Sequence, residues 1–228
     1  MGQQHTYEQL YKLSPKLYNS LYFIRNRSVN LLYLFSNKRI SFTPTINEIY
    51  KKEYLEILDK LNDADRNSTT NIMPEAALYL YNLVRTRKPS IFLETGVAKG
   101  FSTRIILEAM KKNNSGLLVS TEVEKDVGSL VPKELHDRWE LVVGNPKTIL
   151  SSTLRRYDKI DIFLHDSVHS YVQMFGDFVM VEPHIAEHGI LLSDDVNENR
   201  AFLDFAKRIG ANPRIITSYK KCFGIIEL

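Results

Sequence analysis

The sequence has little of what marks disulfide-rich, membrane-spanning or low-complexity proteins. Cys222 is the single cysteine among 228 residues, so no internal disulfide can form, and we expect a reducing, cytoplasmic location. No run of about 18 apolar residues occurs, which argues against a transmembrane helix. Hydrophobic residues make up 43% and charged residues 25% of the chain, as in an average globular protein, which excludes a disordered or collagen-like chain.

The small net charge of +3 does not by itself indicate a nucleic-acid partner, but the charge is unevenly placed. Residues 1–45 carry six basic side chains and one acidic side chain, and they also hold five tyrosines. A basic, aromatic arm of this kind suits a helical extension that packs on its own domain or on a sister chain, and we expect a homo-oligomer formed through it. A lid, a docking helix for another subunit and contact with a membrane surface are alternatives.

Up to about residue 88 the apolar residues follow a helical period. Thr45 and Glu48 have the spacing of a capping box, which predicts a helix start there. The polar stretch 62–71 predicts a loop, and Pro74 suits the first turn of a helix that runs to about Arg87.

From residue 90 onward, short apolar runs alternate with helical segments. The runs are 91–93, 117–120, 141–143, 160–164 and 190–192, and the helices are expected near 102–112, 126–136, 147–156 and 171–186. This alternation predicts an α/β fold with a doubly wound, mostly parallel sheet. The last two runs, 215–218 and 223–228, are joined too closely for a crossover, so an antiparallel last strand completes a seven-stranded sheet. We expect a helical extension over 1–72 and a ligand-binding domain over 73–228.

The segment 91–102 runs from an apolar strand through a glycine turn into a helix. Ligands bind doubly wound sheets at such strand ends, and Gly96 allows both a tight turn and close approach of a ligand. Ser102 lies at the helix start, where its hydroxyl and the free amides can hold a carboxylate. The spacing Gly96-x-x-x-Gly100 differs from the nicotinamide dinucleotide fingerprint and from the phosphate-binding loop, and a simple strand-to-helix turn is the alternative.

An acidic residue, Glu122, ends the second apolar run, 26 positions after Gly96. A carboxylate at this place can accept both hydroxyls of a ribose, although a solvated surface acid would look the same. Gly144 and Asn145 follow the third run and could flank an adenine.

These motifs resemble the class I S-adenosylmethionine-dependent methyltransferases over about residues 73–228. The resemblance implies S-adenosylmethionine as cofactor, with Glu94 and Gly96 at its methionine and ribose part, Ser102 at its amino-acid end and Glu122 at the ribose diol. The implied cofactor-binding residues are Glu94, Thr95, Gly96, Gly100, Ser102, Glu122, Gly144, Asn145 and Asp166.

Three aspartates follow the fourth and fifth runs: Asp166, Asp194 and Asp195. Adjacent parallel strands lie about 4.8 Å apart, so the three carboxylates could converge. Carboxylates without a counter-charge repel one another, and Mg²⁺ or Mn²⁺ would resolve this repulsion. Capping of the helices expected near Asn197 and after Ser170 is the alternative.

The aspartate pattern is similar to that of metal-dependent catechol-type O-methyltransferases, and more closely to the branch that acts on sugar hydroxyls of macrolides. Asp194 follows Asp166 by 28 residues, as in that family. The resemblance implies a vicinal diol as acceptor, a sugar or a catechol-like small molecule. His169 takes the position of the catechol-type lysine base, so we expect His169 and Asp166 to be catalytic, with His165 as the second candidate base.

Three other functions stay open at this point. A non-catalytic or metal-independent S-adenosylmethionine-binding protein would need no aspartate cluster, and a nicotinamide-dependent oxidoreductase would need a closer glycine fingerprint. A nucleic-acid methyltransferase would suit the basic arm, but the Asn/Asp-Pro-Pro-Tyr/Phe signature is absent from the sequence. We therefore expect a small-molecule hydroxyl acceptor and no nucleic acid.

Overall fold

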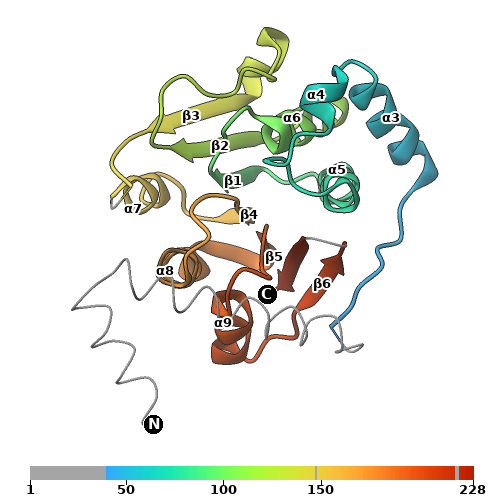
Figure 1. Ribbon diagram of the computed structural model, residues 1–228. Helices are drawn as coiled ribbons and strands as arrows, with labels where there is room; N and C mark the ends of the chain where they lie inside the picture. The colour runs from blue at the N-terminus through green and yellow to red at the C-terminus, as the bar shows by residue number, and fades with distance from the viewer. Residues whose placement is uncertain (1–39, 147, 219–220) are drawn as a thin grey trace.

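The computed structural model describes residues 40–146, 148–218 and 221–228, and these form an α/β fold around one sheet (Figure 1). The seven strands lie in the order β3-β2-β1-β4-β5-β7-β6. They are β1 Ile91–Thr95, β2 Leu117–Glu122, β3 Trp139–Val143, β4 Ile160–His165, β5 Ile185–Ser193, β6 Arg214–Thr217 and β7 Cys222–Glu227. Strands β1 to β5 are parallel, whereas β7 runs antiparallel to both β5 and β6, as the short connection predicted.

Helices cover both faces of the sheet (Figure 1). They are α3 Glu48–Leu58, α4 Asp63–Arg66, α5 Pro74–Arg87, α6 Phe101–Asn113, α7 Ile149–Leu154, α8 Tyr171–Val181 and α9 Ala201–Ile209. Neighbouring strand residues alternate between the two cores: Phe92 packs with α3, α5 and α6, whereas Leu93 packs with α7, α8 and α9. The predicted doubly wound seven-stranded sheet is thereby confirmed.

Several predicted helix limits were wrong. The cap of α3 is Asn47, whose side chain accepts from the amides of Ile49 and Tyr50, and not Thr45. The predicted loop 62–71 contains α4. The helix expected at 126–136 is replaced by turns and a 3₁₀ helix, Lys133–Arg138, because Gly128 adopts a left-handed φ of 73° and Pro132 follows.

The helix expected over 171–186 ends at Val181. A 3₁₀ turn, Glu182–His184, follows it, and β5 already begins at Ile185. Pro183 lies in that turn and lacks the amide proton that a continuing helix would need.

The part of the N-terminal extension that the structure describes packs on the sheet domain. Ile40 and Phe42 exchange backbone hydrogen bonds with Ile215 of β6, at 2.7 and 2.8 Å, and α3 shares the core of α5 and α6. Residues 1–39, which hold most of the basic and tyrosine-rich arm, lie outside the described residues. No described helix is long and apolar enough to cross a membrane, and the cytoplasmic location stays a prediction.

Candidate active site

The candidate site lies where five neighbouring strands end, β3, β2, β1, β4 and β5, and the parallel ladder continues by one residue past four of them. The amide of Gly144 donates to Glu122 O, that of Gly96 to Thr121 O, that of Asp166 to Thr95 O and that of Asp194 to His165 O, at 2.9–3.0 Å. These four hydrogen bonds hold the loops after β3, β1, β4 and β5 side by side. They bring Gly96, Asp166 and Asp194 to one edge, as the sequence predicted.

Gly96 is needed at this edge for two reasons. Its φ of 85° is left-handed, and an added Cβ would lie 2.0 Å from the carbonyl oxygen of Asp166. The loop after β1 can therefore touch the end of β4 only if residue 96 has no side chain.

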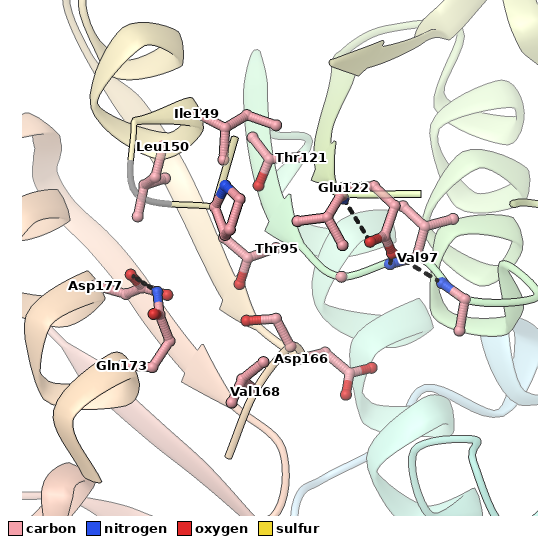
Figure 2. Close-up of a pocket in the computed structure, with 15 residues that line it drawn as sticks. Thr95, Val97, Thr121, Glu122, Ile149, Leu150, Asp166, Val168, Gln173 and Asp177 are labelled. Atoms are coloured by element: carbon pink, nitrogen blue, oxygen red, sulfur yellow. Dashed lines mark hydrogen bonds between the residues drawn. The ribbon is translucent and has the colours of Figure 1, made fainter. Parts of the chain in front are cut away.

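A cavity of about 320 Å³ opens beside this contact, which is within the range of small-molecule sites, about 300–1,000 Å³ (Figure 2). Its walls come from β1, β2, α7, α8 and the loops that follow β1 and β4. The lining residues are Thr95, Gly96, Val97, Ala98, Thr121, Glu122, Val123, Pro146, Ile149, Leu150, Asp166, Ser167, Val168, Gln173 and Asp177. A smaller cavity shares Gly96, Val97, Ala98 and Asp166 with the larger one, and its other lining residues include Ser102 and Asn71.

Glu122 lines the larger cavity and carries a negative charge there. Its Oε2 accepts from the amides of Val97 at 2.9 Å and Ala98 at 3.4 Å (Figure 2). Its Oε1 accepts from the amides of Val123 and Glu124. Burial opposes the charge, but these four amides outweigh it and lower the pKa of Glu122 below its usual value.

Glu94 lies in the interior, where neither cavity includes it in its lining. Its carboxylate accepts hydrogen bonds from the hydroxyls of Ser102 at 2.6 Å, Thr103 at 2.8 Å and Ser120 at 2.8 Å. The Ser102 hydroxyl thus holds a carboxylate of the protein itself and ties α6 to β1. Gly100, Gly144 and Asn145 line neither cavity, whereas Thr95, Gly96, Glu122 and Asp166 line the larger one.

Asp166, Asp194 and Asp195 lie around a lysine that the sequence analysis missed. Nζ of Lys221 is 3.1 Å from Oδ2 of Asp194 and 3.4 Å from Oδ2 of Asp195. We call these four residues the carboxylate cluster. Burial and the neighbouring aspartates raise the pKa of both Asp166 and Asp194, while the aspartates outweigh burial and raise the pKa of Lys221.

The three aspartates do not cap the helices that follow them. Helix α8 is capped by Ser170, and α9 begins after Arg200, with Asn199 accepting from the amide of Ala201 at 2.7 Å. Asp195 itself has a left-handed φ of 48°, which is uncommon outside glycine and is often found at functional sites. The capping interpretation is therefore excluded.

His169 lies between two of these carboxylates. Its Nδ1 is 3.5 Å from Oδ2 of Asp195, and its Nε2 is 3.9 Å from Oδ1 of Asp166. Burial lowers the pKa of His169 to about 4, so the ring is neutral at pH 7 and able to accept a proton.

The side chain of His165 points toward α8. Its Nδ1 is 3.1 Å from Oδ2 of Asp177, and Gln173 donates to the second oxygen of Asp177 at 2.8 Å (Figure 2). The His165 ring meets the His169 ring edge-on at 5.9 Å between centroids. This buried pair supports the position of His169.

No group of three or more His, Cys, Asp or Glu side chains in the described part of the chain is arranged to hold a metal ion. The donor chemistry nevertheless suits a hard cation, because Asp194 is fully buried and its Oδ1 has no hydrogen-bond partner among the described residues. The Lys221 ammonium supplies the positive charge in the arrangement observed.

Comparisons with known proteins agree with the fold. Residues 93–196 match the model of a family described as a methyltransferase domain, and no curated protein matches the chain in sequence. The fold is that of the class I S-adenosylmethionine-dependent methyltransferases, and the predicted resemblance to them is confirmed.

Three solved structures illustrate the likeness. An O-methyltransferase from Bacillus cereus in complex with S-adenosylhomocysteine is 14% identical with a TM-score of 0.59, over 92% of this chain and 100% of that chain. A Podospora anserina methyltransferase bound to S-adenosylhomocysteine is 14% identical with a TM-score of 0.54, over 88% and 95% of the two chains. A Geobacter sulfurreducens methyltransferase is 17% identical with a TM-score of 0.56, over 88% and 96%.

We predict that Gly96→Ala destabilises the fold by about 2–5 kcal/mol, because the new Cβ adds overpacking to left-handed strain. Gly176→Ala in α8 is the matched control: its added Cβ meets no described atom within 4 Å, and we expect a gain of up to about 1 kcal/mol. Urea unfolding measures both changes. Equal stability of the two variants would show that the loop relaxes away from Asp166.

Proposed function

We propose that this protein is an S-adenosylmethionine-dependent O-methyltransferase that acts on a hydroxyl of a vicinal diol in a sugar or a catechol-like small molecule. The observation that carries the proposal is the position of Asp166. This residue lines the cavity suited to the cofactor and also belongs to the carboxylate cluster beside His169. A methyl donor and a hydroxyl acceptor would therefore meet at one residue.

The larger cavity suits the adenosyl part of the cofactor. Apolar side chains of Val123, Ile149 and Leu150 supply flat walls for a purine, and the charged Glu122 supplies an acceptor for ribose hydroxyls. The smaller cavity, with Ser102 and Asn71, continues from Gly96 and suits the amino-acid end. When bound, the cofactor supplies the sulfonium methyl group.

The chain's own residues would then prepare the acceptor. Neutral His169 takes the proton of the acceptor hydroxyl, and Asp166 and Asp195 on either side of its ring stabilise the positive charge that it gains. His165, which is paired with Asp177, packs against the His169 ring and positions it. The backbone contact between Gly96 and Asp166 fixes the distance between the cofactor cavity and the carboxylate cluster.

The finer proposal is that Mg²⁺ or Mn²⁺ assists this step. Asp166, Asp194 and Asp195 would hold the ion, and it would supply a positive charge that lowers the pKa of an acceptor hydroxyl. Oδ1 of Asp194, which has no hydrogen-bond partner among the described residues, supports this assignment, whereas Lys221 would have to leave Asp194 and Asp195 first. Formation of a homo-oligomer through the arm and contact of the arm with a membrane both stay predictions, because most of the arm, residues 1–39, lies outside the described residues.

The direct test is methyl transfer from radiolabelled S-adenosylmethionine to a panel of catechols, glycosides and nucleotide sugars. We expect label in a compound with adjacent hydroxyls and none in its mono-deoxy analogue. Cofactor binding without transfer to any diol would favour the non-catalytic alternative.

Glu122→Ala should weaken binding of S-adenosylhomocysteine by about 1.5–3 kcal/mol, or about 10- to 150-fold, because the ribose hydroxyls lose a charged acceptor. Isothermal calorimetry measures the loss. Glu187→Ala, an exposed glutamate near the start of β5, is the control and should bind as the wild type does. An unchanged dissociation constant for Glu122→Ala would place the ribose elsewhere.

His169→Ala should slow turnover by about 10²–10⁴ at pH 7, the usual share of a general base. Because the pKa of His169 is lowered to about 4, its basic form persists above that pH, and protonation of His169 should not slow the wild type between pH 8 and pH 6. The defect of the variant should shrink as the pH rises and the hydroxyl ionises unaided. His188→Ala, at an exposed position, is the control for the pH profile. Wild-type turnover of His169→Ala at pH 7 would make His165 the next candidate.

Excess EDTA should abolish turnover while calorimetric binding of S-adenosylhomocysteine survives, because the metal would serve the acceptor and not the cofactor. Asp194→Asn should have the same effect as EDTA, since it removes a charged ligand and leaves the glycine loop intact. Full turnover in excess EDTA would contradict the metal proposal and leave Lys221 as the cation of the site.

A further inference from the structure

The carboxylate cluster already contains a cation that is held by three oxygen atoms. Nζ of Lys221 donates to Oδ2 of Asp194 at 3.1 Å and to the carbonyl oxygen of Asn71 at 3.1 Å, and it lies 3.4 Å from Oδ2 of Asp195. The ammonium group thus donates two hydrogen bonds, to Asp194 and Asn71, and forms an ion pair with Asp195. Lys221 is therefore held as a bound cation would be.

Two of these three oxygens are also the ones that a divalent ion would use. Asp194 is fully buried and reaches a positive charge through Oδ2 only, while its Oδ1 has no partner among the described residues. A divalent ion bound to Asp194 and Asp195 would come within a few ångströms of Nζ, where like charges repel strongly at a site screened from water. Both cations cannot occupy the cluster together.

The position of Lys221 allows it to leave. It precedes β7 in the connection from β6, and its side chain keeps 21% exposure, whereas the Asp194 side chain keeps 1%. The lysine is thus more exposed than the buried Asp194, and it has four methylene groups with which to swing outward. Its departure would also release the Asn71 carbonyl, which belongs to the smaller cavity.

We propose that Lys221 is a built-in cation that competes with a divalent metal ion for Asp194 and Asp195. The metal binds only when the Lys221 side chain withdraws, and withdrawal breaks its contact with the segment that precedes α5. This inference rests on the metal-assisted form of the proposed function, because it concerns the same carboxylates.

The test is a Mn²⁺ titration of the full chain, with free Mn²⁺ read by electron paramagnetic resonance. Lys221→Met removes the charge and keeps the aliphatic length, and it should bind Mn²⁺ about tenfold or more tighter than the wild type. Lys111→Met, on an exposed lysine in the last turn of α6, changes the net charge equally and should stay within about twofold of the wild type.

A second measurement needs no variant. Acetic anhydride should modify Lys221 slowly in the metal-free wild type and faster at saturating Mn²⁺, while Lys111 should react equally in both states. Peptide mass spectrometry reads the two lysines in one sample. A rise at Lys221 alone supports displacement by the metal.

Equal Mn²⁺ affinity in the wild type and Lys221→Met, or unchanged acetylation of Lys221 at saturating Mn²⁺, would overturn the inference and leave the metal proposal standing. Absence of Mn²⁺ binding in both proteins would overturn the inference together with the metal proposal. Calorimetry with S-adenosylhomocysteine on the same samples shows whether the protein is folded and the cofactor site intact, so a loss of Mn²⁺ binding is not confused with unfolding.

Discussion

The close backbone contact between Gly96 and the carbonyl of Asp166 is the constraint on which the site depends. With no room for a Cβ between them, the loop after β1 and the end of β4 lie against each other. The cavity bordered by the loop after β1 must therefore lie beside the carboxylate cluster, which includes Asp166 at the end of β4. The separation between a bound cofactor and an acceptor is consequently set by backbone hydrogen bonds of a rigid parallel sheet and not by flexible side chains.

The same edge of the sheet buries carboxyl groups in two different ways. Glu94 is surrounded by three hydroxyl groups that satisfy both oxygens, and this closed network fixes α6 against the sheet, while burial raises the pKa of Glu94. Asp194 instead pairs one oxygen with an ammonium group, and its other oxygen has no partner in the part of the chain that the structure describes. The first arrangement is complete and serves the fold, whereas the second stays open to a ligand and carries a desolvation cost that a bound cation would offset.

The sequence predicted most of the fold because apolar runs indicate buried strands and glycines indicate the turns that end them. It also predicted which residues meet at the strand ends, since Gly96, Asp166 and Asp194 each directly follow a buried strand. Lys221 and Asp177 were missed because one reads as an ordinary polar residue in a hairpin and the other as a polar position of α8. The strand register explains the position of Lys221: Ser193 of β5 pairs with Gly224 of β7, so the residues before β7 lie beside Asp194. Knowledge of this register would have been needed to predict the lysine. The misplaced helix limits at 126–136 and 171–186 reflect Gly128, Pro132 and Pro183, whose effect on the backbone outweighs apolar periodicity.

The contact of Lys221 with Asn71 joins residues 150 positions apart and has a consequence for the order in which the protein assembles. Strand β7 lies between β5 and β6, both of which precede it in the chain. Strand β6 therefore cannot join the sheet until β7 has paired with β5. Docking of β7 is therefore also the event that brings the Lys221 ammonium group to Asp194 and Asp195. Burial of these carboxylates becomes favourable only at that late step, when their counter-charge arrives.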